Sequence, residues 1–316
     1  MIDNKILFLG KVPPPAGGLG IHLQRLMESL GKDNIKYGFH DFRKHRPLTL
    51  FSTLMKYEVG HIHVSNSYFR FCLIILLNLF GVRSVFTFHG NVGRYGDLRN
   101  FIDLLSFKIS NNGIVINQSS FERVKHIKGV KYIPAFIPPI TTKPLQGEIV
   151  KAIHDLKSKS TKLYATNANG LSYDIDGREI YGIFSLVEVF KDLPQFGLVI
   201  SDASGHYSQH FDNIEMYPNI KIISLKHDYY EVLKLVEGSI RATTTDGDAL
   251  SVKESLFLNK ETICTNCVDR PSGVILFEVG DNESLRTIIL GSRIQTDVTK
   301  PKSGYLEIKK ILLNCK

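Results

Sequence analysis

Short apolar runs that end in glycine or in a polar residue alternate along the chain with segments of helical periodicity. The first run, Lys5–Gly10 (KILFLG), has the continuous apolar character of a strand buried on both faces of a parallel sheet. A proline- and glycine-rich loop follows it, and from Ile21 to Leu30 apolar residues recur with the spacing of an amphipathic helix. The pattern predicts a strand, a glycine loop and a helix as the first part of an α/β fold.

This succession recurs along most of the chain. Short apolar runs bounded by turn residues predict the strands His61–Val64, Ser84–Phe88, Gly113–Asn117, Lys162–Thr166, Gly197–Ser201, Ile220–Ile223, Ser239–Thr243 and Thr262–Thr265. Apolar residues that return every three or four positions predict the helices Ser67–Phe80, Asn100–Ser110, Glu148–Ser158, Tyr181–Phe190, Tyr229–Glu237, Ser251–Asn259, Asn282–Gly291 and Tyr305–Leu313, with another opening near Ser119. Such alternation is typical of parallel, doubly wound sheets.

A proline-rich stretch, Lys131–Pro144 (KYIPAFIPPITTKP), interrupts the alternation. Its four prolines resist both helix and central strand, so we predict a strand that runs into an interdomain linker. The expected fold class is therefore α/β, with two Rossmann-like domains that face each other across a cleft. The first domain is expected to cover residues 1–138 and the second residues 139–316, with the C-terminal helix returning toward the cleft.

The composition is that of a globular protein. The chain has 316 residues, of which 43% are hydrophobic and 22% are charged. Its longest apolar run, Phe71–Gly81, is shorter than the roughly 18 residues that a membrane span needs, and the N-terminal sequence lacks a signal-peptide pattern. Four cysteines are too few for a disulfide scaffold, and the single C-x-x-C of Cys264 and Cys267 has no second pair for zinc. We therefore expect a cytoplasmic protein.

Positive charge is concentrated in the first part of the chain. Residues 1–140 contain 18 Lys and Arg against 8 Asp and Glu, whereas residues 141–316 contain 21 against 23. A one-sided basic domain favours phosphate-rich partners such as anionic lipid headgroups or a pyrophosphate-linked substrate, and a merely solvated basic face is the alternative. Because the basic residues are scattered and form no recognisable nucleic-acid-binding module, no nucleic acid is expected as a partner.

The segment Arg241–Glu254 (RATTTDGDALSVKE) carries the most chemical information. It has the pattern of a strand, a tight turn with acidic residues and glycine, and a helix that starts near Leu250 with Ser251 as its predicted N-cap. The N–H groups of such a first turn form a site for an anion such as a pyrophosphate. Glu254, one turn into the helix, would suit two ribose hydroxyls. Asp246 lies on the preceding loop.

This segment resembles the acidic-x7-acidic motif of the retaining glycosyltransferases of family 4, which have the GT-B fold. The family usually has Glu at both positions, whereas this chain has Asp246 and Glu254. The whole string is similar to an R-x-T-x-x-D-G-D-x-x-S-V-x-E variant found among bacterial surface-polysaccharide glycosyltransferases. Asp269-Arg270-Pro271 downstream fits the same pattern.

Three further features extend the resemblance over nearly the whole chain. Gly17-Gly18, followed by His22, resembles the first glycine loop of that family, which lies beside the donor phosphates. His89, in the sequence TFHG, resembles its cleft histidine after the fourth strand. Ile133-Pro134 resembles its exit from the first domain.

The resemblance implies a set of site residues. The implied catalytic residues are His89, Arg178 and Asp246, and the implied donor-binding residues are Gly17, Gly18, Arg241, Gly247, Asp248, Leu250, Ser251 and Glu254. The chain departs from the family where an arginine and a lysine usually grip the diphosphate. Arg178 is the candidate for the arginine, but Tyr181 stands in the place of the lysine.

The function that the resemblance implies is transfer of a sugar, with retention, from a UDP- or GDP-sugar to a lipid-pyrophosphate-linked or growing glycan. The basic first domain would then dock at the inner face of a bacterial membrane, as a peripheral protein of surface-polysaccharide biosynthesis. No cofactor is implied, because the nucleotide sugar is a substrate and such enzymes need no bound metal. His61 and His63, which alternate on one predicted strand, are likewise expected to bind no metal.

Two alternatives to a transferase stay open at the level of sequence. A sugar-nucleotide epimerase of the same fold would keep the nucleotide site but act on one small substrate. The concentration of positive charge in the first domain is evidence against this alternative. A non-catalytic partner of an active transferase is suggested by the missing lysine. It would bind nucleotide weakly or not at all.

Overall fold

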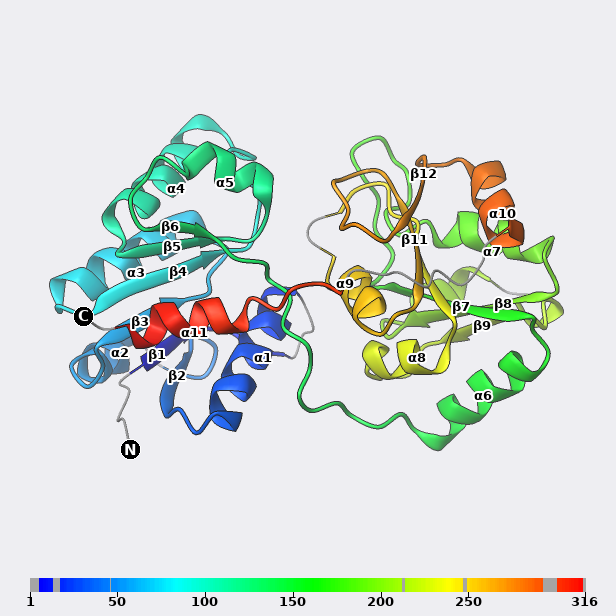
Figure 1. The fold of residues 1–316 in the computed structure, drawn as a ribbon, viewed down its shortest axis with the longest axis horizontal. Coiled ribbons are helices and arrows are strands. Elements are labelled where there is room, and N and C mark those ends of the chain that lie inside the picture. The colour runs from blue at the N-terminus through cyan, green and yellow to red at the C-terminus, as the bar shows by residue number, and fades with distance from the viewer. Residues whose placement is uncertain are drawn as a thin grey trace. The chain divides into compact units, whose positions relative to one another are not determined.

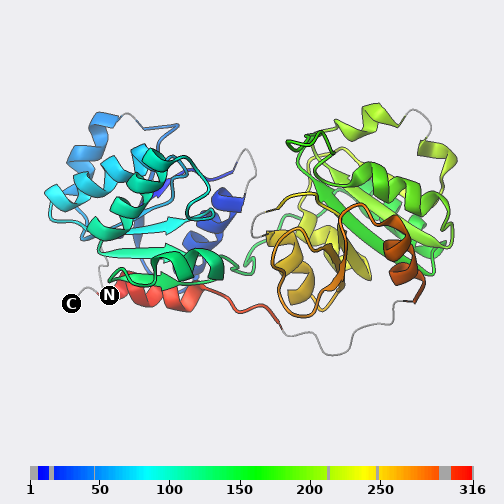
Figure 2. The ribbon, with the colours of Figure 1, turned by 90° about the horizontal axis from the view of Figure 1, so that it is seen from above.

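The computed structural model describes residues 6–13, 18–45, 47–211, 214–246, 249–291 and 300–314. The chain divides into two compact units: the described residues up to Ile140 together with those from Lys302 onward, and Thr141–Pro301. Each unit is a parallel sheet with helices on both faces (Figures 1 and 2). The predicted α/β class with two Rossmann-like domains is confirmed.

The sheet of the first unit has the strand order β2-β1-β3-β4-β5-β6, and all neighbouring strands are parallel. Its strands are β1 (Ile6–Gly10), β2 (Tyr37–Asp41), β3 (Val59–Ile62), β4 (Arg83–Phe88), β5 (Asn112–Val115) and β6 (Val130–Tyr132). The chain places β2 on one side of β1 and β3 on the other, so the strand order reverses between β1 and β3. Doubly wound sheets bind ligands beyond the carboxyl ends of the strands at such a reversal.

Two groups of helices cover this first sheet. The elements are α1 (Gly18–Lys32), α2 (Pro47–Leu54), α3 (Ser67–Leu79), α4 (Asp97–Ile109), α5 (Gln118–Val124) and α11 (Tyr305–Leu313). Alternate residues of β1 contribute to different apolar clusters: Leu7 and Leu9 pack with α2, α3 and α4, whereas Ile6 and Phe8 pack with α1 and α11. The continuous apolar run of β1 therefore serves two cores.

The second unit repeats this plan with the strand order β12-β11-β10-β7-β8-β9, again entirely parallel. Its strands are β7 (Lys162–Ala168), β8 (Phe196–Asp202), β9 (Ile220–Ile223), β10 (Gly238–Arg241), β11 (Glu261–Thr265) and β12 (Ile275–Phe277). The chain runs outward from β7 to β9 and then crosses to the other side of β7. The strand order of the second unit therefore reverses between β7 and β10.

Helices cover both faces of the second sheet as well. They are α6 (Gly147–Ser158), α7 (Ile183–Lys191), α8 (Tyr229–Leu235), α9 (Leu250–Phe257) and α10 (Asn282–Gly291), with short 3-10 helices at Tyr207–His210 and Ile214–Met216. Tyr164 of β7 packs with α7 and α10, and its neighbours Leu163 and Ala165 pack with α6 and α8. Cys264 packs against Val252 and Leu256 of α9, as expected for a strand cysteine.

The last described helix, α11, belongs to the first unit. Its ribbon lies against the first unit (Figures 1 and 2). Ile308, Ile311 and Leu312 are buried in the same apolar cluster as residues of α1. Arg83, at the start of β4, donates hydrogen bonds to the carbonyl oxygens of Ile311 and Asn314. The expectation that one domain runs from residue 139 to the end of the chain is therefore wrong for this segment.

The predicted strands and helices are present, with ends that shift by up to three residues. The strand predicted at His61–Val64 is β3, which lies two residues earlier, and Ser251 is not an N-cap, because α9 begins at Leu250 with Ala249 in that position. The pattern did not predict β2, α2 or β12. Among the described residues, no helix is both long and apolar enough to cross a membrane.

Candidate functional site

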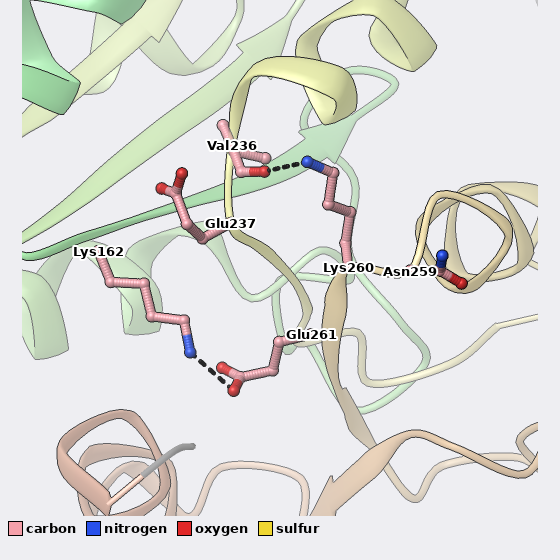
Figure 3. Close-up of a pocket in the computed structure, with 6 residues that line it drawn as sticks. All are labelled: Lys162, Val236, Glu237, Asn259, Lys260 and Glu261. Atoms are coloured by element: carbon pink, nitrogen blue, oxygen red, sulfur yellow. Dashed lines mark hydrogen bonds and ion pairs between the residues drawn. The ribbon is translucent and has the colours of Figure 1, made fainter. Parts of the chain in front are cut away.

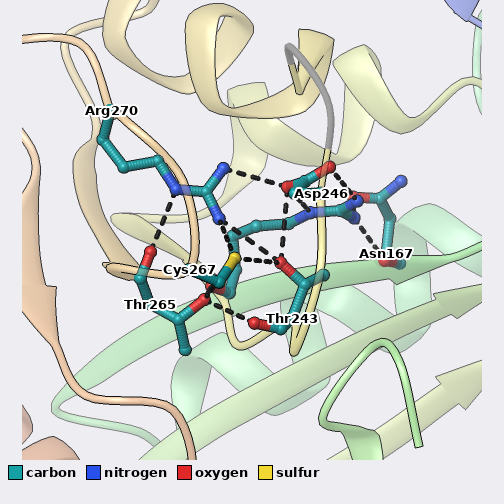
Figure 4. Close-up of polar contacts among 7 residues, drawn as sticks. Asn167, Thr243, Asp246, Thr265, Cys267 and Arg270 are labelled. Carbon is teal, nitrogen blue, oxygen red and sulfur yellow. Dashed lines mark hydrogen bonds and ion pairs between the residues drawn. The ribbon is translucent and has the colours of Figure 1, made fainter. Parts of the chain in front are cut away.

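Several predicted site residues gather at the carboxyl end of β10, next to the reversal of strand order in the second unit. Asp246 lies in the loop after β10, and its carboxylate is held between two guanidinium groups (Figure 4). Arg241 Nε lies 3.1 Å and Arg270 Nη1 lies 2.9 Å from Asp246 Oδ2. The side chains are buried, with exposed fractions of 8% for Asp246 and 2% for Arg270. This cluster combines one negative and two positive charges in little contact with water.

The charges of this cluster stabilise one another. Burial acts to raise the pKa of Asp246, but Arg241 and Arg270 outweigh burial and hold that pKa below its usual value. Burial acts to lower the pKa of Arg241, and Asp246 outweighs it in turn, so the pKa of Arg241 is raised. Asp246 and Arg241 are therefore both ionised at neutral pH. With Arg270, the cluster contains one carboxylate against two guanidinium groups.

Hydrogen bonds from the surrounding strands orient the two guanidinium groups (Figure 4). Arg241 Nη1 donates to the backbone carbonyl of Asn167 on β7 at 3.2 Å. Arg270 Nε donates to the carbonyl of Thr265, the last residue of β11, at 3.0 Å. The hydroxyl of Thr243 donates to Asp246 Oδ2 at 3.3 Å. Because three neighbouring strands hold these groups, their positions are fixed by the sheet.

Helix α9 begins directly after this loop. Its N-cap residue is Ala249, and no described side chain caps the first turn. The first N–H groups of a helix have no partner within the helix, and such a first turn can bind an anion. Glu254 lies one turn further on, with only 5% of the residue exposed, so it is not a surface helix residue. Burial raises the pKa of Tyr229, and both Arg241 and Glu254 are close enough to influence that pKa as well.

Arg178 lies in a different setting from the one predicted. Its guanidinium is exposed and forms ion pairs with Asp174, at 2.9 Å, and with Asp176, at 2.7 Å. The side chain of Tyr181, in the place of the expected lysine, lies under Arg241, whose guanidinium carbon is 5.3 Å from the ring centre. Thus no described contact joins Arg178 to Asp246, whereas Tyr181 contacts the cluster.

The other predicted residues belong to the first unit or lie outside the described residues. Gly18 is the first residue of α1, and His89 directly follows β4, half-buried, with its Nε2 3.1 Å from Nδ1 of His63. Gly17, Gly247 and Asp248 lie outside the described residues. Of the predicted donor-binding residues, Arg241 is joined to Asp246 by a described contact. Leu250, Ser251 and Glu254 lie on α9, which follows the loop of Asp246.

Arg270 and Asn167 complete the cluster but were not among the predicted site residues. In the sequence, Arg270 is only part of the segment Asp269-Arg270-Pro271 that fits the family pattern. Its position in a loop after a strand does not indicate which side chain it contacts. Its partner lies 24 residues earlier in the chain. Only the parallel pairing of β10 with β11 brings the two loops together.

A small hollow in the second unit lies at the opposite edge of the sheet. It is lined by Lys162, Val236, Glu237, Asn259, Lys260 and Glu261 (Figure 3). Lys162 and Glu261 are the first residues of β7 and β11, and they form an ion pair at 2.7 Å. The hollow is therefore at the amino ends of the strands, away from the edge where such sheets bind ligands.

No known family model and no curated protein matches this sequence. Solved structures, in contrast, are similar over almost its whole length. HepE from Anabaena, in complex with UDP and glucose, has a TM-score of 0.64 at 13% identity, over 90% of this chain and 89% of HepE. Sucrose-phosphate synthase from Thermosynechococcus elongatus has a TM-score of 0.62 at 14% identity, over 91% and 89%. A putative UDP-N-acetylglucosamine 2-epimerase from Listeria monocytogenes has 0.65 at 10% identity, over 98% and 95%.

The chain has the GT-B fold. The similarity extends over both units and is as high for an epimerase as for a sucrose-phosphate synthase. At such low identity it shows the architecture alone.

Proposed function

We propose that this GT-B protein is a glycosyltransferase that takes a sugar from a nucleoside-diphosphate sugar, UDP- or GDP-linked, with retention as in family 4. The observation that carries the proposal is the Arg241–Asp246–Arg270 cluster at the reversal of strand order, on the loop that leads into α9. This edge of the sheet offers positive charge and the first turn of a helix to a diphosphate. Glu254, which is buried one turn into α9, is assigned to the ribose.

The reaction makes modest demands on the protein. The bond between the anomeric carbon and the diphosphate oxygen breaks, the acceptor oxygen bonds to that carbon, and the acceptor proton passes to the leaving phosphate. Negative charge therefore develops on the diphosphate, where Arg241, Arg270 and the first turn of α9 stabilise it. Because the phosphate takes the proton, no pair of carboxylates of the glycosidase kind is needed. No metal takes part in this proposal.

The remaining catalytic assignments follow the resemblance. Asp246, ionised between its arginines, is assigned to the hydroxyls of the transferred sugar and to the orientation of both guanidinium groups. His89 is assigned to the reacting sugar. Arg178 is assigned to the diphosphate, a role that requires its ion pairs with Asp174 and Asp176 to open.

The acceptor belongs to the proposal as a lipid-pyrophosphate-linked or growing glycan at the cytoplasmic face of a bacterial membrane. The first unit supports this partner through apolar side chains exposed on or beside α2, α3 and α4. They are Phe51, Met55, Tyr68, Phe69, Ile75, Leu79, Phe80, Leu98, Phe101 and Ile109. We call this set the apolar face. The same unit carries the basic excess of the sequence, which suits anionic headgroups.

An epimerase of the same fold is the second candidate, because epimerases are among the similar structures. The two functions differ in what happens to the nucleotide. A transferase releases UDP or GDP when the sugar passes to an acceptor or to water. An epimerase converts one nucleotide sugar into another and needs no acceptor. Chromatography of the nucleotide sugar after incubation with protein alone therefore distinguishes them.

Calorimetric titration with UDP and with GDP tests the donor site. We expect saturable binding of one nucleotide, and at least about tenfold weaker binding to Glu254→Gln, which removes a carboxylate that accepts two hydroxyl hydrogen bonds. Glu283→Gln on α10 is the matched control, because its carboxylate is exposed and outside the cluster. If neither nucleotide binds, the non-catalytic partner becomes the better explanation. If Glu254→Gln binds as wild type does, the nucleotide site lies elsewhere.

A further inference from the structure

Three histidines come together at the carboxyl ends of the first sheet. His22 lies on α1, His63 follows β3 and His89 follows β4, so the cluster lies at the reversal of strand order in the first unit. One ring nitrogen of each histidine lies within 4.8 Å of those of the other two. His22 and His63 are buried, and His89 is half-buried. From the sequence, His63 is considered only together with His61, on one predicted strand, and no metal is expected there. The sequence does not predict that His63 meets His22 and His89.

The ring of His22 is oriented by a backbone carbonyl. Its Nδ1 lies 2.6 Å from the carbonyl oxygen of Ala135. A carbonyl only accepts hydrogen bonds, so Nδ1 carries the proton and Nε2 of the neutral ring carries a lone pair. Histidines that bind metal ions are commonly held in this way, by a carbonyl that fixes the tautomer and leaves the other nitrogen to the metal.

His63 and His89 lie side by side within the cluster. Nδ1 of His63 lies 3.1 Å from Nε2 of His89, so these two nitrogens face one another. The other nitrogen of His63, Nε2, is buried and has no hydrogen-bond partner among the described residues. An ion bound at Nδ1 would leave the proton of His63 on Nε2, so the ligand atoms of the site are Nδ1 of His63 and Nε2 of His89.

We propose that His22, His63 and His89 form a binding site for a divalent transition-metal ion such as Zn²⁺. Nitrogen ligands of tetrahedral zinc lie about 2.0–2.1 Å from the ion, which puts them about 3.4 Å apart. The separation of 3.1 Å between His63 Nδ1 and His89 Nε2 is close to this value, and the ring nitrogen of His22, within 4.8 Å of both, would have to move closer to the ion. Three protein ligands leave a fourth position to water or another ligand.

His61 is excluded from this site by its own hydrogen bond. Its Nε2 pairs with the hydroxyl of Thr87 at 3.0 Å, within the buried part of the sheet. The sugar transfer proposed above uses no metal, and an ion bound here would occupy the side chain of His89 in place of the sugar contact assigned to it. The site lies wholly in the first unit, so its test needs no nucleotide.

Titration of the full-length protein with Zn²⁺ by calorimetry, and with Co²⁺ by visible absorption, tests the site. We expect one ion per chain, tetrahedral Co²⁺ absorption bands, and binding at least about tenfold weaker in His22→Gln and in His63→Gln. His126→Gln, at an exposed histidine in the turn after α5, is the matched control and should bind as wild type does.

Folding of each variant is checked by circular dichroism. If the buried His63→Gln fails to fold, the half-buried His89→Gln takes its place. Absence of saturable binding to the wild type would overturn the proposal. So would equal affinity in His22→Gln and the His126→Gln control, because the ion would then occupy some other part of the surface.

Discussion

Asp246 is a buried anion whose two partners are themselves buried. Arg270 is 2% exposed and Arg241 is 14% exposed, so neither guanidinium can regain water if the carboxylate is removed. Taking ions out of water costs several kcal/mol each, and the cluster offsets this cost only while the charges are paired. The residue therefore supports both the local fold and the proposed diphosphate site.

The substitution Asp246→Asn should lower the free energy of unfolding by about 3–5 kcal/mol, because it leaves two buried guanidinium groups without a counter-charge. Urea unfolding at neutral pH measures the loss. Asp192→Asn is the control, because Asp192 pairs with Arg286 at a similar distance of 2.9 Å but is 65% exposed. That surface pair should contribute less than about 1 kcal/mol. Equal losses in the two variants would contradict the argument.

The buried histidines make the first unit sensitive to acid. Burial, with a smaller effect of His22, lowers the pKa of His61 from 6.5 to about 3. Because the folded value lies below the unfolded value, the stability that depends on neutral His61 is complete above pH 6.5. It is lost as the pH falls from 6.5 toward 3.

Between pH 6.5 and pH 3, the protonation of one buried histidine such as His61 should lower the free energy of unfolding by about 1.4 kcal/mol for each pH unit. His61→Gln, which keeps a polar group near Thr87 but does not ionise, should reduce the slope by that amount. Urea unfolding at pH 7 and pH 5, in the presence of a metal chelator, measures it. His126→Gln should leave the slope unchanged, and an unchanged slope in His61→Gln would refute the prediction.

At the scale of single elements, the start of α7 depends on one glycine. Gly182 adopts φ +68°, and a Cβ there would clash with the carbonyl oxygen of Ala242, which follows β10. Glu179 accepts hydrogen bonds from the backbone N–H groups of Tyr181 and Ile183, each at 2.6 Å. The turn thus holds Tyr181 against Arg241 and caps α7 with a carboxylate.

The substitution Gly182→Ala should destabilise the second unit by at least about 1–3 kcal/mol, from backbone strain and from the clash with Ala242. Thermal unfolding measures the effect. Gly147→Ala, at the first residue of α6, is the control, because a Cβ there meets no atom within 4 Å. It should be neutral or slightly stabilising. A neutral Gly182→Ala would show that the turn can rearrange.

The elements that the sequence could predict are those with a strong period or a continuous apolar run. Helix α10 and helix α11 have the predicted ends, since both combine amphipathic spacing with a clear stop. Strand β2 (YGFHD) lies at a sheet edge and mixes polar with aromatic residues, so it has no clean pattern. Strand β12 is another edge strand, of three residues, which is too short for any period.

The candidate site was predictable only in part, for a related reason. Asp246 and Glu254 share one short segment with a recognisable spacing, so the sequence alone could point to them. Arg270 reaches Asp246 from another loop, and His22, His63 and His89 meet from three separate elements. Such meetings depend on strand order, which a single sequence does not display.

At the scale of the whole chain, the C-terminal helix α11 packs against the N-terminal helix α1 of the same unit. Tyr305 and Lys309 of α11 both bond to Asp33, which follows α1, and Ile308 packs into the first core. The sequence predicted the helix correctly but not its unit, because an amphipathic helix does not reveal which core it completes. The first unit therefore requires residues from both ends of the chain.

The apolar face and the basic charge of the first unit lead to a last prediction, on membrane binding. Leu79 on α3 is 78% exposed and Phe101 on α4 is 57% exposed. Burying each in a lipid interface would contribute about 1.5–3 kcal/mol, and anionic headgroups would add about 1 kcal/mol for each nearby basic residue. The double substitution of Leu79 and Phe101 by Asp should therefore weaken binding to phosphatidylglycerol vesicles at least tenfold. Cosedimentation measures it.

Two comparisons make this measurement decisive for the docking surface. Leu290→Asp on α10, also an exposed leucine at 56%, changes the second unit and should bind vesicles as wild type does. Neutral phosphatidylcholine vesicles should bind the wild type more weakly, because the basic excess of residues 1–140 then has no counter-charge. If the wild type does not bind phosphatidylglycerol vesicles, the proposed docking to the membrane is wrong and the acceptor must reach this protein from solution. If Leu290→Asp loses binding instead, the second unit is the one that meets the membrane.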